Sequence, residues 1–363
     1  IRDHARFIDK RTVATKDYKI KARRFVIATG SSPAIPALVG LDQIDYLTNE
    51  TIFELTRKPA HLIIIGAGAI GMELAQAHRR LGCKVSVVEK FDPLAKVDPE
   101  LAAIALRRIK AEGIEIYART SVEALKRERN GVSLRIKNGN ETQTLAGSHL
   151  LLAAGRKANI DDLGLEKARI KLNGGAIRVN KGMKTSNRRV YAIGDVVGGL
   201  QFTHVASYQA GLVVRNALFG LRARQKNDII PWAIYCDPEI AEVGLCEREA
   251  KERLGGNFKI MRASFAQNDR AQAEKRTEGL VKLIAGKNGR ILGAGIAGVN
   301  AGELISFFAF AIANRMKVSS LTRFVAPYPT LSEIVKRLGN DFYRDRLDSS
   351  WLRLLRNFNR LLP

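Results

Sequence analysis

The stretch HLIIIGAGAIGMELA, residues 61–75, places a short apolar strand directly before a glycine-rich turn and a helix. Gly66, Gly68 and Gly71 in this stretch fit the spacing GxGxxG. In dinucleotide-binding units these glycines allow a tight turn, close approach of the backbone to a pyrophosphate, and close packing of helix on strand. A second apolar strand, VSVVE, ends at Glu89, 18 residues after Gly71. This order predicts a nucleotide-binding βαβ unit.

Glu89 indicates which dinucleotide the turn accepts. A carboxylate at the end of the second strand accepts hydrogen bonds from both ribose hydroxyls and repels a 2′-phosphate. We therefore expect NADH to be preferred over NADPH, while Lys90 beside the carboxylate weakens that preference. The alternative is a turn that closes an ordinary βαβ unit, with Glu89 simply solvated.

The rest of the chain alternates strands and helices, which indicates an α/β fold. Helices are expected over residues 69–81, 98–112 and 204–220, between strands such as KVSVVEK, VSLRIKNG and VYAIGD. Beyond Pro231 the pattern changes. The run GLVKLIAGKNGRILGAGIAG predicts a hairpin that turns at Asn288 and Gly289, with helices near 301–316 and 330–343 after it. We expect a separate α+β domain there.

The composition excludes several classes of protein. The best candidate for a membrane span, LISFFAFAIA, has only ten residues, whereas a helix needs about 20. The first residues lack the apolar core of a signal peptide, and three cysteines are too few for a disulfide framework, so we expect a cytoplasmic protein. The net charge of +24 favours anionic ligands. No nucleic-acid-binding motif is recognised, and neither a specific nucleic-acid partner nor a metal site is expected.

Three further stretches lie around the glycine-rich turn: VIATGSSPAIP at 26–36, LLLAAGRKANIDDLGL at 150–165 and VYAIGDVVGG at 190–199. In this order they resemble the class I pyridine nucleotide-disulfide oxidoreductases, which include dihydrolipoamide dehydrogenase and mercuric reductase. YCDPEIAEVGLCE and APYPTLSE extend the resemblance over nearly the whole chain. The resemblance implies FAD and NAD as cofactors, with NADP less favoured, and a homodimer. It also implies Rossmann-like FAD/NAD(P)-binding domains followed by a C-terminal α+β dimerisation domain.

The resemblance divides the chain into five segments: a remnant of the FAD-binding domain with the ATG segment (1–58), the NAD-binding domain (59–154), a second FAD segment (155–228), the dimerisation domain (229–345) and a basic amphipathic tail (346–363). The tail carries apolar residues at helical spacing with arginines between them. It can pack on its own domain or on the dimer mate, and the alternative is contact with an anionic membrane surface.

The same resemblance implies the residues that hold the flavin. Asp195 matches the aspartate that accepts a hydrogen bond from the flavin ribitol, and Thr29, Gly30 and Gly155 belong to the ATG and GR segments. The helix that carries His204 and Ala206 would direct its N-terminus at the flavin pyrimidine edge. Glu73 matches a catalytic glutamate that reaches the flavin edge. For Asp195 the alternative is a cap at a strand end, and for Glu73 a glutamate at the surface or at the edge of the core.

The chain also departs from the family pattern. Family members begin with another GxGxxG and a CxxxxC pair that this sequence does not contain, so we expect these 363 residues alone to retain FAD poorly and to leave disulfides unreduced. Cys83, Cys236 and Cys246 do not have the spacing of a redox pair, and a structural role is expected for them.

The motif YPTLSE is a second departure. It has Tyr328 where disulfide reductases of the family have a proton-carrying histidine, while the acidic partner Glu333 remains. Tyrosine, with an ordinary pKa near 10, carries protons poorly at neutral pH. The electron acceptor is therefore left open. Two hypotheses remain: an NADH-dependent flavin oxidoreductase, or a non-catalytic nucleotide-binding and dimerisation remnant.

Overall fold

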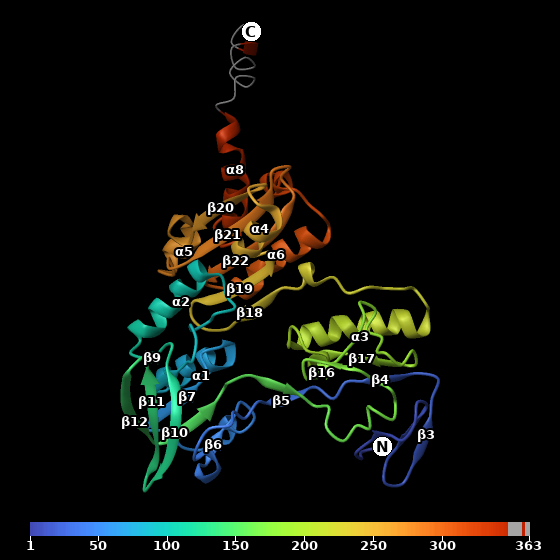
Figure 1. Cartoon of the computed structure of the whole chain (residues 1–363). Coiled ribbons are helices and arrows are strands. Elements are labelled where there is room, and N and C mark those ends of the chain that lie inside the picture. The colour runs from blue at the N-terminus through green and yellow to red at the C-terminus, as the bar shows by residue number, and fades with distance from the viewer. Residues whose placement is uncertain (348–357, 360–363) are drawn as a thin grey trace. The chain divides into compact units, whose positions relative to one another are not determined.

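The computed structural model describes residues 1–347 and 358–359, and Figure 1 shows its secondary structure. Contacts between residues divide the chain into two compact units. The first unit comprises residues 1–36 and 154–227, and the second comprises residues 37–153 together with the described residues from 228 onward. The predicted amphipathic tail lies almost wholly outside the described residues. No helix in the described part of the chain has the length and apolarity that crossing a bilayer requires.

A five-stranded parallel sheet forms the centre of the second unit's nucleotide-binding part. Its order is β6 (Tyr46–Leu47), β13 (His149–Leu152), β7 (His61–Ile65), β8 (Lys84–Val88) and β9 (Glu115–Tyr117). Helices α1 (Ala69–Arg80) and α2 (Pro99–Ala111) confirm the expected helices at 69–81 and 98–112. Leu62, Ile64 and Val87 are fully buried, as expected for parallel strands covered on both faces.

Residues 37–58 lie in the second unit. The sequence analysis assigned them to the first FAD-binding segment, and the structure differs there. Pairing of β6 with β13 places them there. Two short 3₁₀ helices, Leu41–Gln43 and Ile52–Glu54, flank β6.

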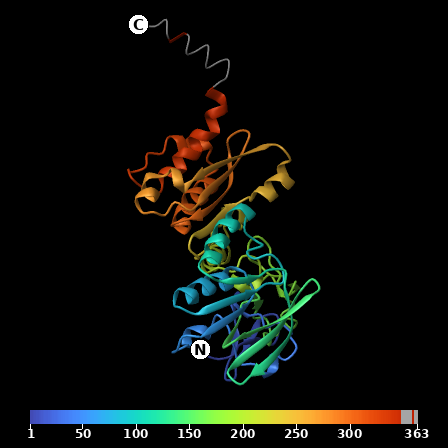
Figure 2. The same cartoon turned by 90° about the vertical axis from the view of Figure 1, so that its left-hand side faces the viewer.

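Beside the parallel sheet lies an antiparallel meander of β10 (Ser121–Glu128), β11 (Gly131–Asn138) and β12 (Glu141–Gly147). Figure 2 shows these strands next to the parallel sheet, where β11 and β12 contact β13 and β7. The sequence predicted β11 and missed β10 and β12. The buried Leu134 and Ile136 anchor the meander to the core that contains Ile63 and Leu150.

The α+β part of the second unit is a five-stranded antiparallel sheet. Its order is β18 (Trp232–Ile234), β19 (Glu239–Gly244), β22 (Ile291–Gly298), β21 (Leu280–Gly286) and β20 (Phe258–Ser264). The predicted hairpin is confirmed by β21 and β22, with Gly289 at φ +80° in the turn. Helix α6 (Ala301–Ala313) packs on β19 and β22, and α8 (Glu333–Leu347) contacts β20. Shorter helices are α4 (Glu247–Leu254), α5 (Asp269–Ala273), α7 (Val318–Thr322) and the 3₁₀ segments Asn227–Ile229 and Phe265–Gln267.

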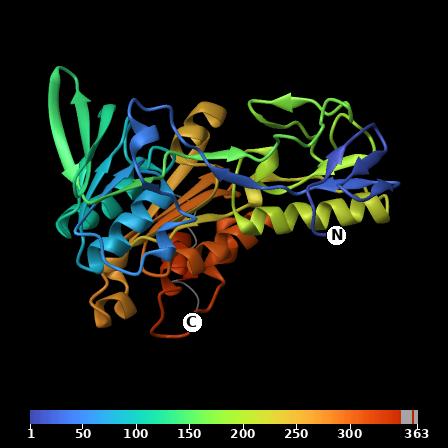
Figure 3. The ribbon, with the colours of Figure 1, turned by 90° about the horizontal axis from the view of Figure 1, so that it is seen from below.

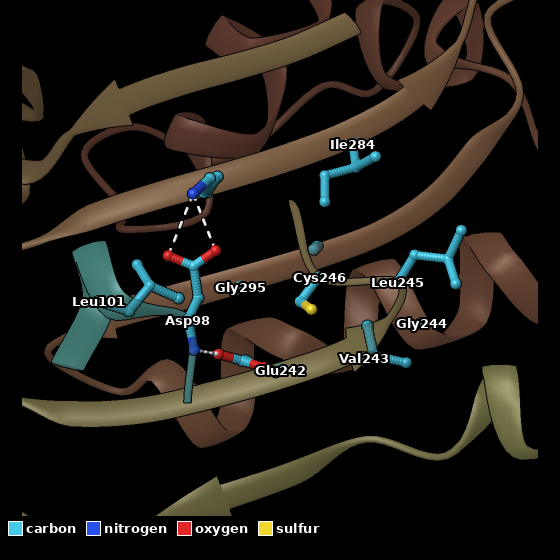
Figure 4. Close-up of a pocket in the computed structure, with 11 residues that line it drawn as sticks. Asp98, Leu101, Glu242, Val243, Gly244, Leu245, Cys246, Ile284 and Gly295 are labelled. Atoms are coloured by element: carbon cyan, nitrogen blue, oxygen red, sulfur yellow. Dashed lines mark hydrogen bonds and ion pairs between the residues drawn. The ribbon is translucent and has the colours of Figure 1, made fainter. Parts of the chain in front are cut away.

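A buried ion cluster fastens α2 to the antiparallel sheet within the second unit. The Lys282 ammonium lies 2.8 Å from the Asp98 carboxylate and 2.6 Å from that of Glu247. The side chains of Lys282 and Asp98 are each only 5% exposed. Figure 4 shows the Asp98 carboxylate with its two dashed contacts, and the Asp98 N–H, which donates to Glu242 at 2.7 Å.

The first unit is built from small sheets and one long helix. Strand β4 (Phe25–Ile27) pairs in parallel with β17 (Val190–Ala192), and β5 (Ser31–Pro33) pairs antiparallel with β14 (Arg156–Ala158). Helix α3 (Thr203–Leu218), seen along one side of this unit in Figure 3, confirms the helix expected at 204–220. The remaining strands are β1 (Arg6–Phe7), β2 (Thr12–Ala14), β3 (Lys19–Lys21), β15 (Leu172–Asn173) and β16 (Ala176–Ile177).

Candidate functional site

The glycine-rich turn between β7 and α1 has the geometry that its spacing predicts. Gly66 has φ +109°, a conformation that favours glycine. A Cβ on Gly71 would lie 1.9 Å from the Gly66 carbonyl oxygen, so only glycine lets the helix approach the turn this closely. A Cβ on Gly68 would meet nothing within 4 Å. The turn is therefore tightly packed at Gly71 and open to a ligand at Gly68.

The N-terminus of α1 offers free hydrogen-bond donors. Gly68 is its N-cap, no side chain among the described residues caps it, and its first turn has no acidic residue. The first N–H groups of a helix lack partners within the helix, and the helix dipole adds positive charge there. This end of α1 therefore fits a pyrophosphate.

The Glu89 carboxylate holds the turn in place. One of its oxygens accepts the N–H of Ala67 at 2.7 Å, and the other accepts the N–H of Phe91 at 2.9 Å. Each carboxylate oxygen has a second lone pair, so these bonds leave capacity for ribose hydroxyls. The neighbouring Lys90 ammonium lies over the Phe91 ring, 5.7 Å from its centroid. Sequence reasoning anticipated a ribose contact for Glu89 and missed its bond to the turn.

Glu73 lies about one turn after the start of α1, and its side chain is half-buried. Its carboxylate accepts the N–H of Tyr235 at 2.8 Å. Burial raises the pKa of the Glu73 carboxyl, and the Tyr235 hydrogen bond opposes this only in part. Glu73 therefore links α1 to the segment before β19.

In the first unit, hydrogen bonds join the ATG segment to the GR segment. The Thr29 hydroxyl donates to the carbonyl of Asn159 at 2.7 Å, and the Asn159 side chain donates to the carbonyl of Thr29 at 2.9 Å. Gly30 and Gly155 have φ of +71° and +120°, and a Cβ on either would face open space. Thr29 and Gly30 therefore lie at one end of the β5–β14 pair, opposite Asn159, and Gly155 lies at its other end, where its carbonyl accepts the N–H of Ala34 at 3.0 Å.

Asp195 lies in the 3₁₀ helix Gly194–Val197 after β17. Its carboxylate accepts the hydroxyl of Ser31 at 2.5 Å and lies 3.6 Å from the guanidinium of Arg156. Arg156 also donates to the Ser31 hydroxyl at 2.7 Å. Ser31 and Arg156 lie within the ATG and GR stretches, but nothing in the sequence predicts that they meet Asp195. The carboxylate is held in a fixed orientation and keeps free lone pairs.

The N-terminus of α3 resembles that of α1. Its N-cap is Phe202, no side chain in the described part of the chain caps it, and its first turn has no acidic residue. The His204 ring stacks on Phe202 at a centroid distance of 5.4 Å. Ala206 lies next to Gly194, where a Cβ would come within 3.4 Å of the Ala206 methyl group. The start of α3 is thereby packed close to the segment that carries Asp195.

Tyr328 is 71% exposed, and its hydroxyl donates to the Asp269 carboxylate at 3.0 Å. This bond and the negative charges of Asp269 and Glu333 raise the pKa of Tyr328 above its ordinary value. Tyr328 therefore carries protons even less readily at neutral pH than a free tyrosine. Asp269, 59 residues earlier in the chain, was missed because no local pattern connects it to the motif.

The three cysteines are free thiols, and Cys83 and Cys236 are buried. Burial raises the pKa of Cys236 to about 12 and also raises the pKa of Cys83 and Cys246. Thiols with raised pKa hold little reactive thiolate at neutral pH.

Comparison with family models gives two matches. Residues 1–210 match the model described as pyridine nucleotide-disulphide oxidoreductase. Residues 230–338 match the model for the dimerisation domain of the same proteins.

Among curated proteins, the chain is 34% identical over 348 residues to a mercuric reductase from Lysinibacillus sphaericus, covering 95% of this chain and 64% of that protein. It is 33% identical over 344 residues to a dihydrolipoyl dehydrogenase from Geobacillus stearothermophilus, covering 92% and 72%. The chain thus spans less than two thirds of the length of that mercuric reductase.

Two solved structures share the fold. A Cu(II) complex of the HOCl-induced flavoprotein disulfide reductase RclA from Escherichia coli superimposes with a TM-score of 0.85 at 27% identity, covering 93% of this chain and 78% of that one. LpdA from Mycobacterium tuberculosis gives a TM-score of 0.86 at 26% identity, covering 94% and 76%.

Proposed function

The chain belongs to the pyridine nucleotide-disulphide oxidoreductase family, and from this premise we propose that it serves in hydride transfer from NADH to FAD and on to an acceptor. The observation that carries the proposal is the turn at Gly66–Gly68–Gly71, open at Gly68 and held by Glu89.

For NADH, we assign the pyrophosphate to the N-terminus of α1. The turn presents free N–H groups there, and the open space at Gly68 lets the phosphate oxygens approach the backbone. Glu89 accepts the adenosine ribose hydroxyls with its remaining lone pairs and repels a 2′-phosphate. Its bonds to Ala67 and Phe91 fix the carboxylate before the ligand arrives.

The first unit provides residues that fit part of an FAD site. The fixed Asp195 carboxylate suits a ribitol hydroxyl, and the open glycines Gly30 and Gly155 allow close approach of a ligand to the backbone. The start of α3 near His204 and Ala206 suits the pyrimidine edge, where a helix dipole stabilises negative charge. When bound, FAD supplies the hydride chemistry, and these residues orient it.

The proton-carrying groups limit the choice of acceptor. Glu73 holds a proton more readily than an ordinary glutamate. Tyr328, hydrogen-bonded to Asp269, cannot replace a histidine as a proton carrier at neutral pH. We therefore propose an acceptor whose reduction does not depend on proton transfer at position 328.

We also propose that the protein forms a homodimer through the dimerisation-domain region, residues 230–338. On α6 the exposed positions Glu303, Ser306, Phe307 and Phe310 share one face, because their spacing follows the helical repeat. Phe307 is 38% exposed and Phe310 is 66% exposed, which makes this face a candidate contact between subunits.

The test is to purify the protein that the gene encodes, incubate it with FAD, remove free flavin and add NADH without oxygen. The proposal predicts a bound flavin band near ~450 nm that NADH bleaches. Failure of the purified protein to bind flavin, or a band that NADH does not bleach, would favour a non-catalytic nucleotide-binding and dimerisation module instead.

A further inference from the structure

A polar cavity of about 380 Å³ lies in the first unit, and none of its lining residues is assigned above to NADH or FAD. Its walls come from Arg24 just before β4, the 180–184 turn, β17, the last turn of α3 and the 220–224 loop. Four basic side chains line it: Arg24, Lys184, Arg222 and Arg224.

Two asparagines fix the walls of this cavity. The Asn216 side chain, on α3, donates to the carbonyls of Gly182 and Ala223 and accepts the N–H of Ala223 at 2.6 Å. The Asn180 side chain accepts the N–H groups of Gly182 and Lys184 at 2.9 and 3.1 Å. The 180–184 turn and the 220–224 loop are therefore both tied to a defined shape, so the cavity exists before a ligand enters.

The four cations have no acidic counterpart in the cavity. No carboxylate lines it, and within residues 1–347 and 358–359 none of the four forms an ion pair with an acidic side chain. Arg24 uses one N–H to donate to the carbonyl of Ala217 at 3.0 Å, and the Lys184 ammonium lies 5.4 Å from the centroid of the Tyr191 ring. These contacts position two of the cations and leave their charge uncompensated.

Uncompensated like charges around one cavity repel one another, and a bound anion relieves that repulsion. Guanidinium groups pair with phosphate through two parallel hydrogen bonds, and a lysine ammonium adds a point charge. The volume falls in the range of small-molecule sites, about 300–1,000 Å³. We propose that this cavity binds a small anion with two or more phosphate groups, such as an inorganic oligophosphate or a nucleoside diphosphate.

The experiment titrates the 363-residue chain with tripolyphosphate by calorimetry in about 0.15 M salt, where attraction over distances beyond ~8 Å is screened. The double variant Lys184→Gln/Arg222→Gln and the single variant Arg224→Gln remove cations from the cavity. The matched control, Arg129→Gln/Lys287→Gln, removes two exposed cations from hairpin turns of the second unit. Circular dichroism of each variant confirms that it is folded.

We expect saturable tripolyphosphate binding by the unmodified chain, at the cavity and also at the pyrophosphate-binding turn of α1. The double variant should bind at least about tenfold more weakly, Arg224→Gln more weakly by a smaller factor, and the control within about twofold of the unmodified chain. Gly68→Val, which obstructs the α1 turn, should remove the second site and leave unchanged the cavity site, the one that the double variant weakens. Equal losses in the double variant and the control, binding that Gly68→Val abolishes completely, or no saturable binding at all would each overturn the proposal.

Discussion

The carboxylate of Glu89 accepts the backbone N–H of Ala67 at 2.7 Å across 22 residues of sequence, so the end of β8 holds the turn that precedes α1. Ala67 is 1% exposed, and its N–H has little access to water as a replacement partner. The group expected to select the dinucleotide therefore also fixes the conformation of the turn that binds it.

The first prediction separates these two roles. Glu89→Ala should lower the free energy of unfolding by about 1–3 kcal/mol, because the Ala67 N–H loses its acceptor. Glu89→Gln keeps one acceptor oxygen but loses the charge, so it should lose less stability while its preference for NADH over NADPH falls by about tenfold. Urea unfolding and calorimetry measure the two effects.

The control for this prediction is Asp92→Asn. It removes an equal charge three residues away, from an exposed carboxylate paired with Arg119. Its preference for NADH should match that of the unmodified chain. An equal fall in the Asp92 variant would mean that general charge, and not Glu89, selects the dinucleotide.

The second prediction concerns the ion cluster at α2. Lys282→Met should destabilise the chain by about 3–5 kcal/mol, because it leaves the buried Asp98 carboxylate without its cation. Lys287→Met changes an exposed lysine in the β21–β22 turn and should have almost no effect. Urea unfolding of both variants measures the difference, and similar small losses would show that the cluster does not stabilise the second unit.

The third prediction is a pH dependence of stability. Burial raises the pKa of Glu242 to about 7, against 4.5 for an ordinary glutamate. The folded chain then binds the proton more tightly than the unfolded chain, so this group's contribution to stability falls as the pH rises from about 4.5 to about 7. The loss can reach about 3 kcal/mol.

Glu242→Gln tests this assignment. Glutamine keeps an oxygen that can accept the Asp98 N–H and has no proton to lose. Relative to the unmodified chain, the variant should gain stability between pH 5 and pH 8 by about 1–3 kcal/mol in urea unfolding. A difference between the two proteins that stays constant across this range would contradict a titration of Glu242.

The fourth prediction concerns the exposed face of α6. Phe307→Ser/Phe310→Ser should convert a dimer into a monomer in light scattering, because it removes the large apolar groups from that face. The unfolding free energy at low protein concentration should fall by no more than about 1–2 kcal/mol, since Phe310 is 66% exposed and Phe307 loses mainly its edge contact with the Phe324 ring. Val214→Ser/Leu218→Ser, on the exposed side of α3, is the matched control. Dimers that persist in the α6 variant would place the interface elsewhere.

The sequence predicted those elements whose pattern is local and strong. The strand, turn and helix at 61–80 follow from an apolar run and glycine spacing, and the β21–β22 hairpin follows from two apolar runs around Asn288 and Gly289. Strands β10 and β12 were missed because charged and polar residues interrupt their alternation, as in SVEALKRE. Their pairing with β11 supplies the hydrogen bonds that the local sequence does not indicate.

The site residues also fall into two groups: those that a local pattern predicts and those whose contacts join distant segments. Gly66, Gly68, Gly71 and Glu89 are visible from spacing because the turn and its strand are close in sequence. Arg156 lies 125 residues from Ser31, so their hydrogen bond depends on how the segments of the first unit assemble. Long-range hydrogen bonds of this kind have no sequence signature without a fold to place them.

The most direct test of the NADH site at the β7–α1 turn is a calorimetric measurement of NADH binding to the unmodified chain and to Gly68→Val. Gly68 has extended backbone angles, φ −78° and ψ −170°, and a Cβ there meets nothing, so valine fits the fold and fills only the space assigned to the ligand. We predict that the unmodified chain binds NADH at least about tenfold more tightly than NADPH. Gly68→Val should weaken NADH binding by about a hundredfold. Its free energy of unfolding should stay within about 1 kcal/mol of that of the unmodified chain. NADH binding that is absent from the unmodified chain, or undiminished in Gly68→Val, would contradict the assignment of this turn as the NADH site.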